Sequence, residues 1–330
     1  MTPIWLPRRA ALIGGASLLA TPSLTRAQTW RPRQPVRTII AAAAAGTLDI
    51  HARAAAPVIS QGLGQTLVLE NNGGAAGRVA SAMVGRATPD GHTLLVASGD
   101  GIVISDILYG RAQGMLRSRL KPVTMTITAA QLLVTHPNSG IRSVEDYVAR
   151  ARQEQGLTLG VPGHGGIAHL ISEMLNRGLG KMRVVHVPYR GGGPATLDLL
   201  AGQIDAMIIT LPAVTDHVRS GRLRPLAVST LQRDPAMPDV PALAEAAIAG
   251  FDVPSTQGVL VPEGTPDAVI DAWSQAWRAA LQTPTVAQKL TDLGFVIAAT
   301  TPIGFQESLE AANSRFSEVI AAAGIKAEDA

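Results

Sequence analysis

Gly163-His164-Gly165-Gly166 and Tyr189-Arg190-Gly191-Gly192-Gly193 are the two stretches of this chain that decide its fold. Each leads from a strand-like run of residues into a helix-like run. Because glycine has no Cβ atom, such a stretch can turn sharply and present several backbone N–H groups to one point, and the following helix adds about half a positive charge at its N-terminus. The two stretches therefore predict a binding site for an anion, and nothing in them requires catalysis.

Strand-like and helix-like runs alternate along most of the chain, which predicts parallel sheets flanked by helices. Val269, Trp273, Trp277 and Leu281 recur at helical spacing and predict a further helix whose tryptophans lie in the core. The predicted strands are 36–41, 66–69, 93–97, 157–161, 183–187 and 205–209, with one long or two short strands in 122–135. The predicted helices are 49–60, 77–87, 143–155, 167–179, 194–202 and 302–323.

The middle of the chain has a complete α/β pattern of its own, and 330 residues suit two lobes of ordinary size. We therefore predict that residues 129–255 form one lobe, inserted into a lobe that is built from residues 28–128 and 256–330. Two segments would cross between the lobes, near 125–131 and 251–257. The predicted fold class is α/β, with a mixed or mostly parallel sheet flanked by helices in each lobe.

The charge and composition exclude several classes of partner. Arg8, Arg9 and Arg26 are the only charged residues in 1–27 and equal the formal net charge of +3, so the remaining chain is neutral overall. A neutral chain with 3% aromatic residues has neither the basic surface nor the stacking side chains that nucleic-acid binding needs. Hydrophobic residues at 46% exclude a disordered chain.

The first residues predict an export signal. Arg8-Arg9 precede an apolar stretch at 10–20, and Thr25-Arg26-Ala27 supplies the small residues that a signal peptidase requires. The paired arginines are typical of the twin-arginine route, so we predict a periplasmic protein cleaved near Ala27. The alternative, a membrane anchor, needs about 20 apolar residues, and this run is about half that length. The absence of cysteine fits either a periplasmic or a cytosolic protein.

Five loops lie where a strand leads into a helix, which is where ligands bind in open α/β sheets. Because three of the loops come from the outer lobe and two from the inner, they predict a cleft between the lobes that closes around a ligand. Four or five hydrogen bonds to a charged group, at about 1.5–3 kcal/mol each, would suffice for a micromolar complex. The loops are 45–49, 71–77, 98–101, 163–166 and 190–193.

Several motifs in order make the chain, from about Arg37 to Ile325, resemble the periplasmic receptors of tripartite tricarboxylate transporters, often called the Bug family. The resemblance implies a type II-like Venus flytrap, in which a carboxylic acid is held between two lobes by loop amides, hydroxyls and water and is delivered to a membrane permease. The motifs are Asp49-Ile50-His51-Ala52-Arg53, Glu70-Asn71, Pro89-Asp90-Gly91-His92-Thr93-Leu94-Leu95, His186-Val187-Pro188-Tyr189-Arg190-Gly191, Asp198-Leu199-Leu200-Ala201-Gly202-Gln203-Ile204-Asp205, Leu226-Ala227-Val228-Ser229 and Pro238-Asp239-Val240-Pro241.

Carried over by position, the resemblance assigns ligand contacts to both lobes. It implies no cofactor, and as partners a small carboxylate or amino acid and the permease subunits, with the receptor itself a monomer. The outer-lobe contacts are Ala45, Gly46, Thr47, Asp49, Ser98, Gly99, Asp100 and Gly101. The inner-lobe contacts are Pro162, Gly163, His164, Gly165, Gly166, Ile167, His169, Tyr189, Arg190, Gly191, Gly192, Asp205 and Thr210.

The chain departs from the family pattern at four places. Residues 41–45 are alanines followed by the single glycine Gly46, where the family has a proline-containing, double-glycine loop. His164 replaces a small polar residue, Thr256 stands where an aromatic residue is frequent, and Asp100 stands where a small neutral residue is common. An acid at position 100 would repel a carboxylate, so one hypothesis is that the ligand also carries an amino group. The alternative is that Asp100 caps the following helix or points to solvent.

His169 and Glu173 are four residues apart on a predicted helix, and His164 and His186 could lie nearby, which would allow a metal site. We predict none, because the spacing crosses a loop, no cysteine assists and no HExxH motif is present. His186 is expected to pack at a strand end, and His169 to orient the loop or its waters.

Enzyme motifs are missing from the sequence, which has no GxSxG elbow and no Lys-Ser/Thr ending on the 163–166 loop. Asp49 and Asp205 could act as acid and base, but we expect Asp49 to organise its helix start and Asp205 to tie loops together. Arg190 either holds an acid by a forked pair or is a solvated cation. We therefore predict a receptor that is not an enzyme; the alternatives are a sensory receptor for a membrane kinase and an enzyme acting on a small carboxylate.

Overall fold

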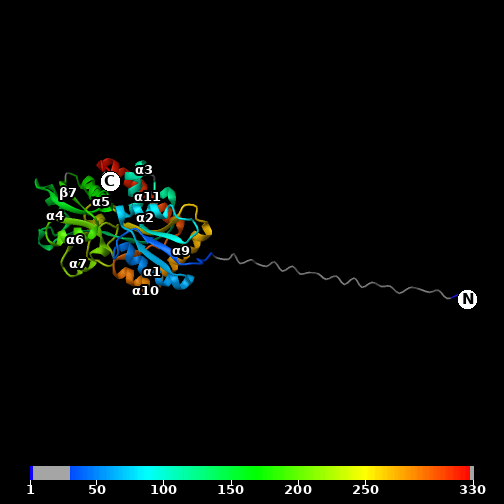
Figure 1. The fold of residues 1–330 in the computed structure, drawn as a ribbon. Helices are drawn as coiled ribbons and strands as arrows, with labels where there is room; N and C mark the ends of the chain where they lie inside the picture. The colour runs from blue at the N-terminus through cyan, green and yellow to red at the C-terminus, as the bar shows by residue number, and fades with distance from the viewer. Residues whose placement is uncertain (3–29, 114, 181, 328–330) are drawn as a thin grey trace.

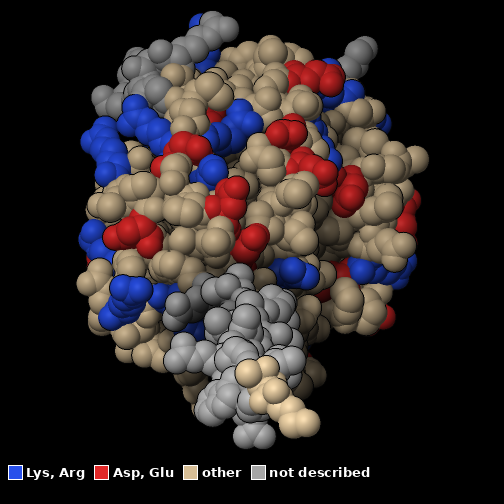
Figure 2. Space-filling model, turned by 90° about the vertical axis from the view of Figure 1, so that its right-hand side faces the viewer, with Lys and Arg blue, Asp and Glu red and all other residues tan. Residues whose placement is uncertain are grey.

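The computed structural model describes residues 1–2, 30–113, 115–180 and 182–327. The predicted export signal at 1–27 therefore lies almost wholly outside the described residues. Within the described part, no helix is both long and apolar enough to cross a membrane. On the face drawn in Figure 2, acidic and basic side chains are interspersed, so neither sign of charge dominates that surface.

The chain folds into two sheets, each flanked by helices (Figure 1). The first sheet has six strands in the order β11-β4-β10-β3-β1-β2, and β1 is parallel to both of its neighbours. The alternation of strands and helices along the sequence predicted this parallel arrangement. The predicted two-lobed α/β fold class is confirmed. The strands of this sheet are β1 (Val36–Ile40), β2 (Leu67–Asn71), β3 (Thr93–Ser98), β4 (Leu120–Ala129), β10 (Ser255–Pro262) and β11 (Phe295–Ile297).

The second sheet has five strands in the order β7-β6-β8-β5-β9 and is built entirely from the middle of the chain. Its members β6, β7 and β8 are parallel, whereas β5 runs antiparallel to both of its neighbours. The strands are β5 (Gln131–Thr135), β6 (Leu157–Pro162), β7 (Val184–Tyr189), β8 (Ala206–Thr210) and β9 (Arg224–Val228). We call the part around the first sheet lobe 1 and the part around the second sheet lobe 2.

Helices cover both faces of each sheet. In lobe 1, residues of α1, α9 and α10 pack in one apolar cluster, and residues of α2, α3 and α11 pack in another. In lobe 2, α4, α5 and α8 contribute to one cluster and α6 to another. The helices are α1 (Thr47–Leu63), α2 (Arg78–Val84), α3 (Gly99–Gln113), α4 (Val144–Arg152), α5 (Ile167–Leu179), α6 (Gly192–Leu200), α7 (Thr215–Arg219), α8 (Leu243–Ala246), α9 (Asp267–Leu281), α10 (Pro284–Asp292) and α11 (Pro302–Ala323).

The tryptophans of α9 lie in the core, as their spacing predicted. Trp273 and Trp277 are both 0% exposed, and the indole N–H of Trp273 donates to the carbonyl of Gly91 at 2.9 Å. Because its N–H is hydrogen-bonded, the buried indole of Trp273 adds apolar surface to the core without leaving a polar atom unpaired. Helix α9 is thus a packing element of lobe 1.

The chain passes between the lobes at two points. β4 ends at Ala129 and β5 begins at Gln131, so the run predicted at 122–135 is two strands that belong to different sheets. The return passage leads into β10 at Ser255, which pairs with Ala129. The two crossings therefore lie side by side.

The register places the binding edges of both sheets at these crossings. In lobe 1, Ser98 at the end of β3 pairs with Gln257 near the start of β10. In lobe 2, Thr210 at the end of β8 pairs with Gln131 at the start of β5. Because the carboxyl ends of parallel strands share one edge, the loops after β1, β2 and β3 face the same junction as the loops after β6, β7 and β8.

The lobes also pack directly on one another beside this junction. α11 of lobe 1 lies against α5 of lobe 2, and one apolar cluster runs through both, including Phe316 and Leu175 (Figure 1). A Cβ atom added to Gly165 would lie 2.7 Å from the Leu108 side chain of α3, so the glycine lets the lobe 2 loop approach lobe 1. One side of the interlobe space is therefore closed by apolar contact.

Candidate functional site

The loop after β1 is held by the carboxylate of Asp49, in the first turn of α1. This carboxylate accepts hydrogen bonds from the backbone N–H of Ala45 at 2.9 Å and from the amide of Asn71 at 3.0 Å, and it pairs with Arg53 at 2.8 Å. Burial alone would raise the pKa of Asp49, but these partners outweigh it and hold the pKa below its usual value. As predicted, Asp49 organises its helix start; its partners also link the loops after β1 and β2.

A buried polar network lies beneath this loop. The amide of Gln257 on β10 donates to the hydroxyl of Thr47 at 2.8 Å, and the hydroxyl of Thr126 donates to the Gln257 carbonyl at 2.9 Å. His51 is 0% exposed, with its ring nitrogens near Thr47 and Thr126, and burial lowers its pKa to about 4. The neutral histidine thus joins the start of α1 to β4, the strand that leads into lobe 2. Gln257 and Thr126 were not identified from the sequence, since only the three-dimensional pairing brings them under Thr47.

Gly99, Asp100 and Gly101 form the first turn of α3, which corrects the prediction of a loop at 98–101. Two glycines favoured a turn, but Gly99 is required for another reason: a Cβ there would lie 2.6 Å from the hydroxyl of Thr256. The N–H of Gly101 donates to the Ser98 hydroxyl at 3.0 Å, which satisfies one amide of this helix start.

The carboxylate of Asp100 has partners inside the protein. It is 2% exposed and accepts hydrogen bonds from the backbone N–H of Thr256 at 2.7 Å and from the Thr256 hydroxyl at 3.1 Å. Two departures from the family pattern therefore pair with each other. Burial raises the pKa of Asp100 to about 6. The Asp100 carboxylate is therefore neither exposed to solvent nor placed to contact an amino group of a ligand. It instead fixes the start of β10 to the start of α3.

The loop after β2 approaches the same edge in a strained conformation. Ala75 and Ala76 have φ angles of 48° and 54°, in the left-handed region that side chains with a Cβ avoid. Gly77 packs so tightly that an added Cβ would lie 2.9 Å from the carbonyl oxygen of Ala41. Arg78 follows, and its guanidinium carbon lies 3.9 Å from the centre of the Tyr109 ring.

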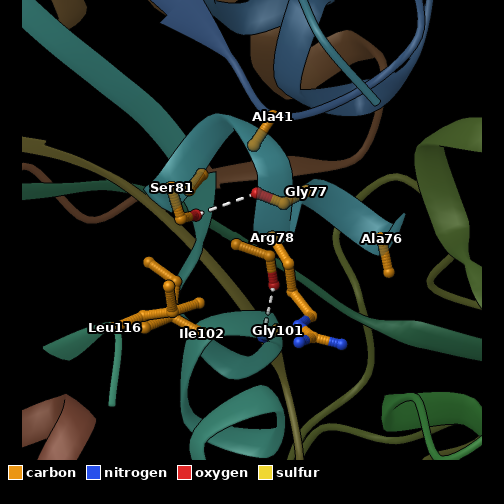
Figure 3. Close-up of a pocket in the computed structure, with 10 residues that line it drawn as sticks. Ala41, Ala76, Gly77, Arg78, Ser81, Gly101, Ile102 and Leu116 are labelled. Atoms are coloured by element: carbon orange, nitrogen blue, oxygen red, sulfur yellow. Dashed lines mark hydrogen bonds between the residues drawn. The ribbon is translucent and has the colours of Figure 1, made fainter. Parts of the chain in front are cut away.

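An open cavity lies between this loop and the start of α3 (Figure 3). Ser98 and Gly101, both predicted ligand contacts, form part of its wall, and so does Arg78, which the sequence analysis did not select. The loop was predicted from its glycines and alanines, whereas Arg78 belongs to no motif that would predict a ligand contact. The lining residues are Ala41, Ala76, Gly77, Arg78, Ser81, Ala97, Ser98, Gly101, Ile102 and Leu116.

The glycine loop at 163–166 uses much of its own hydrogen-bonding capacity. Its amides at Gly163, Gly165 and Gly166 donate to the Tyr189 carbonyl, to Nδ1 of His169 and to the Gly163 carbonyl, at 2.9, 3.1 and 3.2 Å. The prediction that this whole loop presents amides to an anion is therefore wrong for these three groups. The next amides, at Ile167 and Ala168 in the first turn of α5, have no acceptor within the helix and point toward its N-terminus.

The second glycine loop begins after β7 at Arg190 and ends at Gly192, where α6 starts. The hydroxyl of Tyr189 donates to Asp198 at 2.7 Å, and burial, together with this acidic partner, raises the pKa of Tyr189 to about 12. Arg190 is exposed. Thr210, at the end of β8, accepts a hydrogen bond from the Gln131 amide at 2.9 Å and keeps its own O–H as a donor at the interlobe edge.

Asp205 does not lie with the other predicted site residues. It precedes β8, whereas Thr210 ends it, and five residues of strand separate them by about 16 Å. Its carboxylate accepts from the N–H and the hydroxyl of Thr158 at 2.7 and 2.8 Å. Asp205 thus ties the amino ends of β6 and β8 together, and its assignment as a ligand contact is wrong because it stands at the opposite edge of the sheet.

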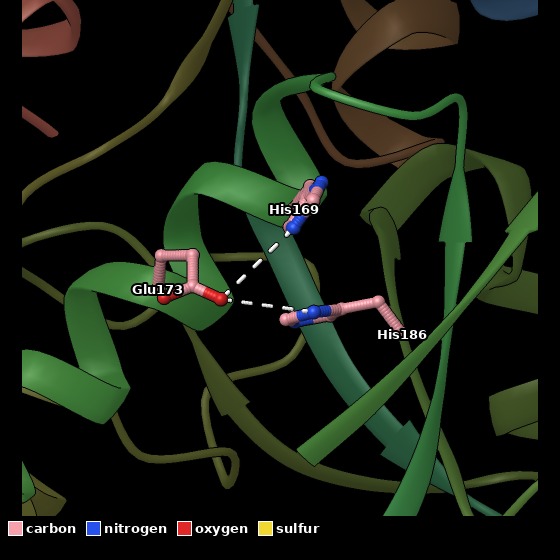
Figure 4. Close-up of side chains that lie close together, drawn as sticks. All are labelled: His169, Glu173 and His186. Atoms are coloured by element: carbon pink, nitrogen blue, oxygen red, sulfur yellow. Dashed lines mark ion pairs between the residues drawn. The ribbon is translucent and has the colours of Figure 1, made fainter. Parts of the chain in front are cut away.

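His169, Glu173 and His186 meet on the inner side of α5 (Figure 4). Nε2 of His169 and Nδ1 of His186 lie 4.0 and 3.7 Å from the Glu173 carboxylate. Burial lowers the pKa values of both histidines to about 4 and raises that of Glu173. The His164 ring lies 5.2 Å from that of His169.

The hydrogen bond from Gly165 decides the tautomer of His169. Because Nδ1 accepts the Gly165 N–H, the proton of the neutral ring is on Nε2, which faces Glu173. A histidine that binds a metal through Nε2 instead donates from Nδ1. A metal at these three side chains would therefore have to break the bond that orients the 163–166 loop, and the prediction of no metal site is kept.

Two α/β lobes with loops converging on a double crossing define the class of two-lobed periplasmic binding proteins. Within this class, residues 51–324 match the tripartite tricarboxylate transporter family receptor, TctC, and the chain belongs to this family. The sequence resemblance is thereby confirmed.

Relatives of the chain are known in sequence and in structure. It is 32% identical over 316 residues to the UPF0065 protein in the tcbD-tcbE intergenic region of Pseudomonas sp. (strain P51), covering 94% of each chain. Two solved structures are similar over 89% and 88% of this chain and 99% of theirs. They are Rpa4515 of R. palustris with adipate, at a TM-score of 0.82 and 30% identity, and MatC (Rpa3494) of Rhodopseudomonas palustris with bound malate, at 0.79 and 28%.

Proposed function

We propose that this chain is an extracytoplasmic receptor that binds a small carboxylic acid between its lobes and delivers it to a tripartite tricarboxylate-type membrane transporter. The observation that carries the proposal is the convergence of helix starts and strand ends from both sheets on the double crossing at Ala129 and Ser255. Amides at the first turns of α1, α3 and α5 lack acceptors within their helices and suit a carboxylate. Adipate and malate, found with two similar structures, are acids of this class.

The proposed contacts come from each lobe. In lobe 1 they are the loop Ala45, Gly46 and Thr47 and the amides of Gly99 and Asp100, since the Gly101 amide is bound to Ser98. In lobe 2 they are the first turn of α5, the loop Arg190 to Gly192, and Thr210. A ligand that contacts both lobes stabilises their closure, because it binds the closed form more tightly than the open one. The carboxylates of Asp49 and Asp100 are engaged within lobe 1, and we assign neither a role in turnover.

Calorimetric titration of dialysed protein with adipate, malate and other small acids tests the proposal. We expect micromolar binding of at least one acid, recovery of that acid unchanged, and about a tenfold loss of affinity in Thr210→Val, which removes one hydrogen bond to a charged group. Thr88→Val, at an exposed position outside the site, should bind as the wild type does. Failure of every acid to bind, or its chemical conversion, would reject the receptor function.

Export is part of the same proposal. We expect protein recovered from the periplasm to begin just after Ala27, as N-terminal sequencing would show. Replacing Arg8 and Arg9 by lysine should leave the precursor uncleaved in the cytoplasm, because the paired arginines are the feature that a twin-arginine signal requires. Normal cleavage in that variant would point to a different export route.

A further inference from the structure

The cavity beside α3 is a separate compartment of the interlobe edge (Figure 3). It comprises about 260 Å³ of space between atoms, part of it open solvent. One wall carries Ser98 and Gly101, which flank the proposed ligand contacts Gly99 and Asp100 in the sequence, and the other carries Ala76 and Arg78 from the loop after β2. A ligand held at the interlobe amides could therefore extend into it.

Arg78 is the charged residue of this cavity, and its charge is not neutralised by the protein. Among the described residues, no acidic side chain forms an ion pair with it, whereas Arg37, Arg53, Arg117 and Arg233 each pair with an acid at 2.8–2.9 Å. Its partner is the Tyr109 ring, which holds the guanidinium by its face and leaves the N–H donors at the rim available. A partly buried cation held in place without an acid is suited to an anion from outside.

A second polar group of the cavity, the Ser98 hydroxyl, is also a donor. The Ser98 hydroxyl accepts the Gly101 N–H at 3.0 Å, so its own O–H is left to donate. The nearest acid along α3, Asp100, has its carboxylate bound to Thr256 instead. The remaining wall includes Ile102 and Leu116, against which a carbon chain can pack, and Ser81, whose hydroxyl donates to the Gly77 carbonyl at 2.9 Å.

We propose that this cavity is a subsite for a second carboxylate of the ligand, bound by the Arg78 guanidinium and the Ser98 hydroxyl. The inference rests on the proposed function and narrows it to dicarboxylates. One carboxylate is held by the amides between the lobes, and the other reaches Arg78 past the wall formed by Ser98 and Gly101. Arg78 is then a residue that determines specificity, because only an acid with two carboxylates makes both contacts.

Pairs of acids of equal chain length test the subsite. We titrate four pairs of acids into the wild type, Arg78→Gln and Arg86→Gln. The pairs are succinate with butyrate, glutarate with pentanoate, adipate with hexanoate, and pimelate with heptanoate. Arg86 is exposed, lies just beyond the end of α2 and is not in the cavity wall, so its replacement changes the net charge equally. We expect Arg78→Gln to bind the preferred dicarboxylate about 10- to 100-fold more weakly and its monocarboxylate partner within about threefold. Arg86→Gln should match the wild type for both.

The outcomes separate the subsite from the function. Wild-type binding of mono- and dicarboxylates with equal affinity, or an equal loss for both in Arg78→Gln, overturns the subsite and leaves the receptor function intact. Absence of binding by any acid to the wild type rejects the receptor function and the subsite with it. Should Arg78→Gln fail to fold, Tyr109→Leu removes the support of the guanidinium and keeps its charge; a weakening confined to the dicarboxylate supports the subsite, and unchanged binding of both acids refutes it.

Discussion

The two lobes bring loops to the same kind of place, the carboxyl ends of parallel strands, but they hold those loops by different means. In lobe 1 a charged acceptor, the Asp49 carboxylate, binds the Ala45 amide, and several positions with left-handed φ angles are alanines. In lobe 2 a neutral acceptor, His169, binds the Gly165 amide, and the left-handed positions of the 163–166 loop are Gly163 and Gly165. Glycine content is therefore a poor guide to which loop is pre-organised, and the buried acceptor is a better one.

Replacing the charged acceptor should have the largest effect. In Asp49→Ala, the Ala45 amide, the Asn71 amide and Arg53 all lose their common partner, and we expect a loss of about 2–4 kcal/mol in the free energy of unfolding by urea. Because the folded state lowers the pKa of Asp49, its stabilisation is present above the usual pKa of about 4 and is lost as the pH falls further. The difference between variant and wild type should thus shrink in acid.

The exposed first-turn acid of α7 supplies the control, since Asp216→Ala removes a carboxylate in the same helical position without buried partners. It should change stability by at most about 0.5 kcal/mol. Equal losses in the two variants would mean that the Asp49 network contributes no more than a surface acid.

Replacing the neutral acceptor should have a smaller effect, with a pH dependence of the same sign but at higher pH. His169→Ala leaves the Gly165 amide without its acceptor and opens space in the core, for which we expect about 2 kcal/mol of destabilisation at pH 7.5. The unfolded chain binds a proton at His169 near pH 6.5 while the folded chain resists it to about pH 4, so wild-type stability rises with pH across this range.

The variant should lose part of that rise, at most about 1.4 kcal/mol per pH unit for one proton. The remaining slope belongs to His51 and His186, whose pKa values are lowered in the same way, and is opposed by Glu173, Asp100 and Asp234, whose pKa values burial raises. Urea melts at half-unit pH steps would measure both slopes, and parallel curves for variant and wild type would show that His169 is not the group that resists protonation.

Asp100 should show that not every acid of lobe 1 behaves as Asp49 does. Its folded pKa of about 6 lies above that of an unfolded aspartate, so its contribution is present at low pH and is lost as the pH rises from about 4 to 6. Asp100→Asn keeps an acceptor for the Thr256 amide and does not ionise. Between pH 4 and 7.5, we expect the free energy of unfolding of the variant to rise by about 1 kcal/mol or more relative to that of the wild type, as measured by thermal melts. A difference in stability that does not change with pH would contradict the effect of burial on Asp100.

The sequence predicted those parts of the molecule that short-range patterns determine. Helices α5 and α11 match the predicted bounds, because Gly166 and Gly180 flank the first and Thr301-Pro302 and Gly324 flank the second. Helix α3 is absent from the predicted helices, since Gly99 and Gly101 at its start resemble a turn until Thr256 is known to pack against them. The two crossings were expected near 125–131 and 251–257, whereas the exact lobe boundaries stay predictions.

The candidate site was harder to predict because its decisive contacts join distant residues. The Asp100–Thr256 pair and the Thr47–Gln257 bond join residues that are 156 and 210 positions apart, with the whole of lobe 2 between them, and no local signal announces them. Asp205 was misplaced because a motif gives a residue's position in the chain and not the end of the sheet at which it stands. The ligand contacts themselves stay predictions, to be tested by the titrations above.

Exchanging glycine and alanine at the left-handed positions tests the other difference between the two lobes and should have effects of at most about 2 kcal/mol. Gly163 has a φ angle of 93° and open space around its Cβ position, so Gly163→Ala should cost about 1–2 kcal/mol through backbone strain alone. Ala76→Gly relieves similar strain at φ 54°, but glycine gains conformational entropy in the unfolded chain, and the net change should be within about 0.5 kcal/mol of zero. Gly193→Ala, helical and equally open, is the control and should stabilise by a few tenths of a kcal/mol. If Gly163→Ala were as stable as Gly193→Ala, the left-handed turn of the lobe 2 loop would not depend on glycine, and the lobes would differ only in the acceptors that hold their amides.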